Sequence, residues 1–364
     1  MKCFSGWLFS RIGGLVFCLG IAQFAIAAQV KTIAYVANSG SSSVSVIDTT
    51  TNTVTATVPV GLCPTGVAIT PDATRVYVTN QCSNSVSVIN TASNTVVATI
   101  GVGSIPIGVA ITPNGVRAYV ANADDSANSV SVIDTASNTV IATVDILLPV
   151  WIAITPDSTR AYVTQSEDSD SVSVIETATN TVTAMVGVGR APFGVAITPD
   201  GTRAYVTNQS SNSVSVIDIA SNTEIAIVEV GTIPFGVAIN PDGTRAYVAN
   251  QSSNSVSVID TASNIVVGAA AVGRTPFGVA VTPEGSRAYV TNQSSNSVSV
   301  IDTASNTVVT TVQVGRAPSG IAITPRIASP TLKNQCKNGG WRAFTVPRKF
   351  KNQGDCVSFV NHRK

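Results

Sequence analysis

Histidine is almost absent from this chain of 364 residues, whose single histidine is His362, near the C-terminal end. This scarcity excludes catalytic triads that depend on histidine, most zinc sites, and ligation of a haem by the repeats described below. The motifs Cys-x-x-Cys-His, Gly-x-x-x-x-Gly-Lys, Gly-x-Ser-x-Gly and Gly-x-Gly-x-x-Gly are also absent from the sequence. Catalysis by carboxylates alone stays open, because a pair of acids is enough for glycoside hydrolysis.

Charged and aromatic residues are few as well. They make up 11% and 5% of the chain, whereas an ordinary globular domain is about 25% charged. Ser, Thr, Asn and Val take their place. Val and Thr favour strands, and Asn, Ser and Gly favour turns, so the composition predicts an all-β protein.

Only one stretch, residues 12–26, is both long and apolar. Positive charge from Lys2 and Arg11 precedes it, and the small residues of Ala25-Ile26-Ala27 end it. We therefore predict a signal peptide over residues 1–28 and an exported chain that is secreted, periplasmic or on the cell surface. An uncleaved membrane anchor is the alternative, but the run is too short for one.

Two of the six cysteines fall within the predicted signal peptide. The other four would meet an oxidising compartment, where an even number of cysteines indicates two disulfides. They are Cys63, Cys82, Cys336 and Cys356.

The seven tyrosines of the chain mark an internal repeat, because they stand 42 or 43 residues apart. Each repeat holds four short β patterns, as at 194–198, 203–208, 213–218 and 223–228, separated by turn-forming segments. Four strands in about 40–45 residues is the size of one propeller blade. The tyrosines are Tyr35, Tyr77, Tyr119, Tyr162, Tyr205, Tyr247 and Tyr289.

A solenoid is the competing architecture, and the ends of the array decide between the two. The chain enters the array at a second-strand pattern (33–36) and leaves it after a first-strand pattern (320–324). A closed ring needs such complementary ends, because closure removes exposed strand edges. We therefore predict a seven-bladed β-propeller of four-stranded antiparallel blades over residues 29–325, closed by strand 320–324 beside the N-terminal strands.

The repeated sequence also resembles a known family. Tyr-Val-Thr-Asn recurs at 77–80, 205–208 and 289–292, and segments such as GVAITPDGTR (194–203) precede it. On these residues, the chain from 29 to 325 resembles the YVTN-repeat β-propellers, whose relatives include surface-layer proteins of bacteria and archaea. More distant propellers with similar repeats are lyases, lactonases and cofactor-bearing dehydrogenase subunits. The resemblance implies the fold but leaves the function open.

Side chains that recur in every copy are interpreted as scaffold. If the second and third strands of the fifth repeat pair about residues 210 and 211, Arg203 faces Asp218. The same register joins Arg245 to Asp260 and Arg287 to Asp302. A cross-strand ion pair contributes about 0.2–1 kcal/mol, and a single active site does not need a carboxylate repeated in every blade.

We therefore look for function where the copies differ, and four differences lie on one face. This face, called the top, carries the second-to-third strand loops and the blade connections. The first difference is Cys63 with Cys82, which face each other across one hairpin where another blade has Ala191 and Ser210. A disulfide is predicted here; a metal site is the alternative, but no further cysteine ligand lies nearby in the sequence.

The second difference is a pair of lengthened acidic loops, 122–129 and 165–171, on adjacent blades. Their carboxylates are candidate Ca²⁺ ligands, because calcium takes six to eight oxygen ligands. Their spacing matches no calcium-loop motif, so solvated acidic loops are the preferred interpretation. The five residues are Asp124, Asp125, Glu167, Asp168 and Asp170.

The remaining two differences involve the blade connections. DILLPVW (145–151) is one residue shorter than its sister segments, and Trp151 replaces a glycine, so it is either a ligand contact or local repacking. Aromatic and basic residues elsewhere in the connections could line a funnel for a small anionic or glycan-like ligand, or the aromatics could pack against neighbouring blades. These residues are Phe193, Phe235, Phe277, Arg190, Arg274 and Arg316.

After Pro325 the repeats stop and the charge changes sign. Residues 29–325 carry a formal charge of −9, whereas residues 326–364 carry +8. Cys336 and Cys356 are predicted to staple this tail into a small module. Its charge suits docking on the acidic propeller or contact with an anionic envelope surface, and nucleic acid is a less available partner for an exported chain.

Together these observations predict an exported, non-enzymatic propeller with no cofactor, which acts as a binding or interaction scaffold associated with the cell surface or envelope. Its expected partner is a protein, a glycan or a small anionic ligand. The alternative is a metal-assisted enzyme of the lyase or lactonase type, with its site on the top face and a metal held by the acidic loops.

Overall fold

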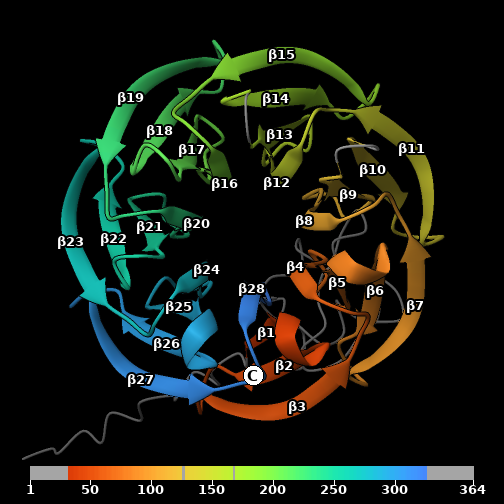
Figure 1. The fold of residues 1–364 in the computed structure, drawn as a ribbon, viewed down its shortest axis with the longest axis horizontal. Helices are drawn as coiled ribbons and strands as arrows, with labels where there is room; N and C mark the ends of the chain where they lie inside the picture. The colour runs from red at the N-terminus through yellow and green to blue at the C-terminus, as the bar shows by residue number, and fades with distance from the viewer. Residues whose placement is uncertain (1–31, 125–127, 167–168, 326–364) are drawn as a thin grey trace, which may run out of the picture. The chain divides into compact units, whose positions relative to one another are not determined.

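The computed structural model describes residues 32–124, 128–166 and 169–325. These residues form seven four-stranded antiparallel sheets, arranged as blades around one axis (Figure 1). The seven-bladed propeller predicted from the repeat is confirmed. The predicted signal peptide and the tail with Cys336 and Cys356 lie outside the described residues.

Each blade has one innermost strand at the axis, a second and a third strand, and an outer strand at the perimeter. The innermost strands are β4 (Pro64–Ile69), β8 (Pro106–Ile111), β12 (Pro149–Ile154), β16 (Pro192–Ile197), β20 (Pro234–Ile239), β24 (Pro276–Val281) and β28 (Pro318–Ile323). The second strands are β1 (Ile33–Asn38), β5 (Arg75–Asn80), β9 (Arg117–Asn122), β13 (Arg160–Gln165), β17 (Arg203–Asn208), β21 (Arg245–Asn250) and β25 (Arg287–Asn292).

The third strands are β2 (Ser43–Asp48), β6 (Ser85–Asn90), β10 (Ser129–Asp134), β14 (Ser171–Glu176), β18 (Ser213–Asp218), β22 (Ser255–Asp260) and β26 (Ser297–Asp302). The outer strands are β3 (Thr53–Pro59), β7 (Thr95–Gly101), β11 (Thr139–Asp145), β15 (Thr181–Gly187), β19 (Thr223–Glu229), β23 (Ile265–Ala271) and β27 (Thr307–Gln313). Short 3₁₀ turns follow three second strands: η1 (Ser39–Ser41), η2 (Gln81–Ser83) and η3 (Gln293–Ser295). Blade 1 contains β28 and β1 to β3, and blades 2 to 7 follow in chain order, starting with β4 to β7.

The ring closes as predicted, with the last strand completing the first blade. Strand β28 pairs antiparallel with β1, so that Tyr35 faces Ala322 and Val36 faces Ile321. In Figure 1 the blue β28 lies beside the red β1. Because the first and last strands share one sheet, blade 1 cannot form unless both ends of the array are in place.

The hydrophobic core lies between neighbouring blades rather than inside one sheet. Seven clusters of buried residues occur, and each combines side chains from two adjacent blades. In the cluster between blades 7 and 1, Val298 and Val300 pack with Ala34 and Val36. The alternation of Val and Ser in the repeated SVSVI segment follows from this arrangement, because small and bulky faces of neighbouring sheets must nest.

The predicted strand register is confirmed, but one predicted ion pair is replaced by a contact between blades. Arg203 pairs with Asp218 in the β17–β18 ladder. However, its Nη1 donates a hydrogen bond of 2.6 Å to the carbonyl oxygen of Thr261 in the next blade. The arginines of blades 6 and 7 do form the predicted pairs within their own blades, Arg245 with Asp260 and Arg287 with Asp302.

The repeated tyrosines also join one blade to the next. The Tyr77 hydroxyl donates to Oδ1 of Asn138 in blade 3 at 2.7 Å, and Arg75 beside it donates to the carbonyl oxygen of Thr135 at 2.7 Å. The same contact crosses the closure, where the Tyr289 hydroxyl donates to Asn52 Oδ1 at 2.6 Å. Equivalent pairs are Tyr35–Asn94, Tyr119–Asn180, Tyr162–Asn222 and Tyr205–Asn264.

These buried tyrosines make the propeller sensitive to alkali. Burial raises the pKa of Tyr35 and Tyr289 to about 12, and that of the other five in the same direction. The folded state therefore favours the neutral phenol, and this stabilisation, complete below pH 10, is lost as the pH rises from 10 towards 12. We expect the loss of folded structure, followed by circular dichroism, and the increase in tyrosinate absorbance to occur together in this range. Ionisation well below the unfolding transition would contradict the arrangement.

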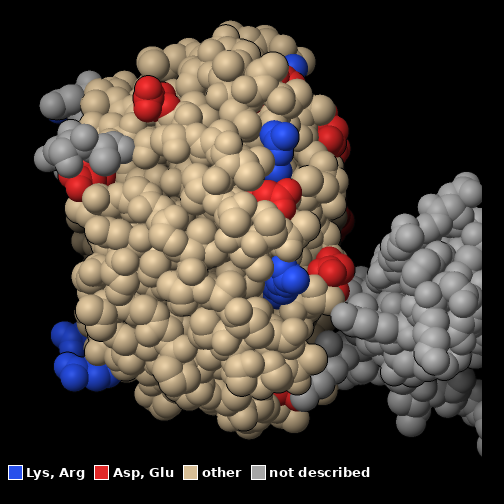
Figure 2. Space-filling model, turned by 90° about the vertical axis from the view of Figure 1, so that its right-hand side faces the viewer, with Lys and Arg blue, Asp and Glu red and all other residues tan. Residues whose placement is uncertain are grey.

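The wall of the propeller, formed by the outer strands, is poor in charge. Figure 2 shows charged side chains gathered towards the rims, with an uncharged surface between them. Exposed aliphatic side chains on this wall include Ile227 at 59% and Ile265 at 60% exposure. Among the described residues, no helix has the length and apolar character needed to cross a membrane.

Candidate functional site

The blade connections on the top face are held by the repeated Ser-Asn loops between second and third strands. In blade 5, Ser211 Oγ accepts a hydrogen bond of 2.8 Å from the backbone N–H of Arg190. Asn212 Oδ1 accepts one of 2.9 Å from Ile233, in the following connection. The repeated QSSNS sequence is therefore scaffold, as interpreted from its repetition, and its work is to fix where each connection crosses the top.

The residue before the proline of each connection adopts a left-handed backbone conformation. In blade 3 this residue is Ile105, with φ of 52°, a costly conformation for a β-branched side chain. Its backbone N–H donates to Asn84 Oδ1 at 3.1 Å, which holds the turn in place. Because all seven connections share this conformation, it belongs to the architecture rather than to one site.

Aromatic side chains from blades 4 to 7 meet at the top of the axis. The ring centroids of Phe193 and Phe235 are 4.6 Å apart, and those of Phe235 and Phe277 are 5.0 Å apart. Phe193 also lies 5.5 Å from Phe277, although blade 6 separates their blades, so the rings of three consecutive blades converge towards the axis. Trp151 extends the group, with its ring 5.8 Å from Phe193. We call these four residues the axial aromatic cluster.

The sequence left open whether these aromatics contact a ligand or pack in the protein. In the structure their rings pack against one another, and three of the four stay partly exposed. Phe277 is buried, whereas Trp151, Phe193 and Phe235 are half-buried. Trp151 also packs against the core between blades 4 and 5. The cluster is thus supported from below and keeps part of three rings open to solvent.

Trp151 takes a position that is glycine in the other six innermost strands. In blade 3 the equivalent residue is Gly108, and the neighbouring innermost strand leaves no room for a side chain on it. A Cβ on Gly108 would lie 2.6 Å from the carbonyl oxygen of Val150. The backbone at Trp151 keeps the usual contacts, and its N–H donates to Thr164 Oγ1 at 3.0 Å. The indole is therefore an addition to the frame at one blade only.

The shortened connection before Trp151 is matched by a second substitution in the same blade. Other second strands end in Asn, whose amide nitrogen donates to two serines, but β13 ends in Gln165. The longer side chain reaches the connection, where its Nε2 donates to the carbonyl oxygen of Leu147 at 3.0 Å. Its Oε1 accepts hydrogen bonds from Ser171 and Ser173. Sequence analysis missed this partnership, although a Gln in place of the repeated Asn was visible.

The connections around the cluster differ in chemistry from one side to the other. Arg190, Arg274 and Arg316 are exposed on the connections into blades 5, 7 and 1. Leu62, Ile105 and Leu147 are exposed on the connections into blades 2, 3 and 4, at 58%, 37% and 51%. The predicted basic rim is thus present on one side only, and an apolar rim that sequence analysis missed lies on the other.

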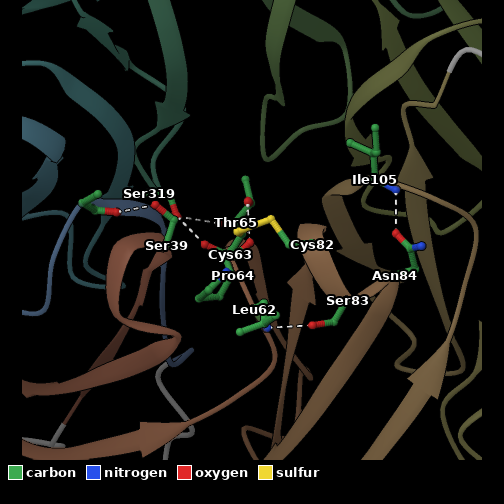
Figure 3. The surroundings of a disulfide bond; sticks show 11 residues. Ser39, Leu62, Cys63, Pro64, Thr65, Cys82, Ser83, Asn84, Ile105 and Ser319 are labelled. Carbon is green, nitrogen blue, oxygen red and sulfur yellow. Dashed lines mark hydrogen bonds between the residues drawn. A yellow bond between two sulfur atoms is a disulfide. The ribbon is translucent and has the colours of Figure 1, made fainter.

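Cys63 and Cys82 are joined by a disulfide, with their Cα atoms 5.4 Å apart. This is the pair that the register predicts from the sequence. Figure 3 shows the bond beside Pro64, whose carbonyl oxygen accepts a hydrogen bond of 2.9 Å from Ser319 Oγ of the closing strand. The disulfide therefore fixes the connection that flanks the closure of the ring.

The acidic loops are only partly within the described residues. Asp125, Glu167 and Asp168 lie outside them. Asp170 takes the place of the capping Asn of other blades, and its Oδ1 accepts a hydrogen bond of 2.9 Å from the backbone N–H of Ala191. Asp124 follows β9, which ends at Asn122, and has interactions of its own. Within residues 32–124, 128–166 and 169–325, no cluster of three or more acidic, cysteine or histidine side chains is placed to hold a metal.

Hollows between blades occur on the opposite face, called the bottom, which carries the turns between first and second and between third and fourth strands. One of about 460 Å³ lies between blades 2 and 3 and is lined by Asp72 and Arg75. Another of about 350 Å³ lies between blades 4 and 5 and is lined by Asp157, Asp200 and Asp218. Sequence analysis did not find these hollows, because each is shared by turns of two repeats.

Comparison with known families supports a β-propeller and leaves the finer grouping open. Residues 238–327 match the model of the YNCE-like β-propellers, and residues 152–265 match that of the seven-bladed β-propeller lactonases. Each match spans less than half of the chain. No curated protein matches the sequence.

Solved structures with the same fold share at most a quarter of the sequence in the cases compared. Hydrazine synthase from Kuenenia stuttgartiensis is 25% identical, with a TM-score of 0.69 over 74% of this chain and 92% of that chain. A functionally unknown protein from Desulfotomaculum acetoxidans is 24% identical, with a TM-score of 0.72 over 80% and 99%. The dihydro-heme d1 dehydrogenase NirN is 16% identical, with a TM-score of 0.60 over 80% and 74%. The latter two likenesses concern the fold alone.

Proposed function

We infer that this protein is an exported, non-enzymatic binding propeller of the YVTN-repeat type, which holds its partner on the top face over the axial aromatic cluster. The observation that carries this conclusion is the meeting of Trp151, Phe193 and Phe235 at the axis of an otherwise repetitive frame. The side chains that recur in every blade are engaged in structural contacts, so recognition can occur at the residues that differ between blades.

The chemistry of the top face favours a ligand that is both apolar and anionic. Half-buried aromatic rings bind apolar groups without a large ordering cost, since packing already holds them. Arg190 and Arg274 present guanidinium groups, which pair with carboxylate, sulfate or phosphate. The exposed Leu62 and Leu147 enlarge the apolar surface on the other side.

The proposal is tested with 8-anilinonaphthalene-1-sulfonate, an anionic aromatic dye, by energy transfer from Trp151, the one tryptophan of the described residues. We expect saturable transfer that weakens roughly tenfold when Arg190 and Arg274 are both replaced by Thr, the residue at the equivalent Thr232. Ile225→Thr on the perimeter wall is the control, because Ile225 is 49% exposed but lies on the outer strand β19, away from the axis. Equal weakening by both changes would remove the top face as the binding surface.

The rival function is a lactonase-type enzyme, and the match of residues 152–265 to the lactonase model favours it over other enzymes. Hydrolysis of aliphatic and aromatic lactones, measured with and without added Ca²⁺ or Mg²⁺, separates the two functions. Turnover that is lost in the Arg190→Thr/Arg274→Thr variant would replace the binding proposal with an enzymatic one. A rate unchanged from the uncatalysed reaction is the result expected here.

A further inference from the structure

We propose that the basic segment 326–364 binds the acidic bottom face of its own propeller, and that this face is a built receptor for it. The inference does not depend on the proposed function of the top face. It rests on where the carboxylates lie, on what the arginines among them are doing, and on where the chain leaves the ring.

Carboxylates are concentrated on the bottom face, because the repeat places an acid in two of its turns. Among the described residues, eleven acids surround the axis there, against six arginines. Five exposed acids lie in the turn between the first and second strands of a blade, and the other six end third strands. The acids are Asp72, Asp157, Asp200, Asp242, Glu284, Asp48, Asp134, Glu176, Asp218, Asp260 and Asp302.

The arginines of this face are already engaged, so they do not neutralise the whole ring. Four of them donate to backbone carbonyl oxygens of the next blade: Arg75, Arg117, Arg160 and Arg203. The remaining two, Arg245 and Arg287, form salt bridges with Asp260 and Asp302. Because the described acids outnumber the described arginines on this face by eleven to six, the face keeps a net negative charge.

Two of these carboxylates have a lowered pKa, which favours their charged form. Hydrogen bonds from the Thr198 hydroxyl and the Thr202 backbone N–H lower the pKa of Asp200, and equivalent bonds lower that of Asp157. The hollow between blades 4 and 5 is lined by Asp157, Asp200 and Asp218 with a single arginine, Arg160. A hollow of about 350 Å³ with this lining is large enough for the side chain of a lysine or an arginine.

The tail leaves the propeller on this same face. Strand β28 runs from the top to the bottom and ends at Ile323. There the backbone N–H of Thr324 donates to the carbonyl oxygen of Ile33, and that of Ile33 donates to Thr324 Oγ1. The described chain therefore ends, at Pro325, beside the acidic ring. A short tether gives a segment an effective concentration of the order of millimolar.

The sequence outside the ring supplies the complementary charge. Residues 326–364 contain nine lysines and arginines and a single acid, Asp355. Lysine is absent from residues 32–332, whereas the tail contains five. The tail thus matches the bottom face in charge, while the top face carries Arg190, Arg274 and Arg316, which would repel it.

This distribution of lysine allows an unambiguous experiment on the full chain. A zero-length carbodiimide cross-linker joins a lysine amine to a carboxylate, so products between residues 32–325 and the tail must start from a tail lysine. We expect cross-links from Lys333, Lys337, Lys349 and Lys351 to Asp72, Asp157, Asp200, Asp242 or Glu284. The exposed Asp145 and Glu229, at the top ends of outer strands, are internal controls and should be joined at least about fivefold less often. A mixture of ¹⁵N-labelled and unlabelled protein distinguishes links within one chain from links between chains.

The repeat also offers a matched variant that removes charge without altering the turn. Blade 3 carries Asn114 where four other blades carry Asp, and its Oδ1 accepts the same hydrogen bonds, from Thr112 at 2.7 Å and Val116 at 3.0 Å. Replacing Asp72, Asp157, Asp200 and Asp242 with Asn should leave the propeller folded. It should reduce the remaining intrachain cross-links to Glu284 and the third-strand acids several-fold, and make tail cleavage by trypsin about tenfold faster at low salt. The pair Asp145→Asn and Glu229→Gln should change neither.

Three results would overturn the proposal. They are cross-links spread equally over both faces, links found only between chains, and trypsin sensitivity unchanged in the four-Asn variant. A tail that gives no intrachain links but sediments with vesicles containing anionic phosphatidylglycerol would assign it to an envelope surface instead. Loss of dye binding on the top face would leave this inference untouched, since the two faces are tested separately.

Discussion

Replacement of Gly108 by alanine should destabilise the propeller by about 3 kcal/mol, at the upper end of the usual cost of overpacking. A Cβ at this position would lie 2.6 Å from the carbonyl oxygen of Val150 and 2.8 Å from Cα of Trp151. Both atoms belong to the backbone of the neighbouring innermost strand, so no side-chain rotation can relieve the contact. Two blades would have to separate, and the core between them would lose packing.

The control for this change is Gly101→Ala in the adjacent blade. Gly101 ends the outer strand β7, and a Cβ there meets nothing within 4 Å. Because Gly101 is exposed, its replacement should alter the free energy of unfolding by no more than about 0.5 kcal/mol. Denaturant-induced unfolding of both variants, followed by circular dichroism, measures the difference. Similar stabilities for the two would mean that the innermost strands are not in close contact.

Removal of the Cys63–Cys82 disulfide should be the other large effect, at about 3 kcal/mol. The bond closes a loop with a sequence separation of 19, and the loss of this constraint on the unfolded chain sets the magnitude. The best variant is Cys63→Ala with Cys82→Ser, because blade 5 carries Ala191 and Ser210 at the same places and forms the same connection. There the Ser210 N–H still donates to the carbonyl oxygen of Arg190.

The comparison that isolates the bond is unfolding with and without a reductant. Wild-type protein should lose stability when reduced, and the double variant should not respond. Because Pro64, next to Cys63, accepts a hydrogen bond from Ser319 of the closing strand, we expect the seam of the ring to open first. Faster hydrogen exchange at Ile321 than at Val195, its equivalent in blade 5, would report this. If the double variant, the reduced wild type and the oxidised wild type were equally stable, the bond would add no stability.

Much of the frame could be predicted because the sequence repeats. The spacing of the tyrosines indicates the blade size, and the complementary ends indicate the closure of β28 on β1. Cys63 and Cys82 are found by register counting, since both lie near one hairpin. Such features are local or periodic, and a strand has only two faces on which a side chain can lie.

Other features were beyond this reasoning because they depend on contacts between repeats. The direction of Arg203 is one example: its register partner is Asp218, but its guanidinium reaches Thr261 in the next blade. The partnership of Gln165 with Leu147 is another, since it depends on the path of a shortened connection. Side-chain direction across a blade interface is set by packing, which the order of residues along one strand does not contain.

The sequence by itself determined the seven blades, their strand register, the closing strand and the candidate disulfide, because these follow from periodicity and from the pairing of neighbouring segments. Only the tertiary structure decided that Phe193 and Phe277, from blades that are not adjacent, meet at 5.5 Å, and that acids from many turns form one ring on the bottom face. The physical reason is ring closure. Bending the array into a circle brings residues of non-adjacent blades together at the axis and places equivalent turns on one rim.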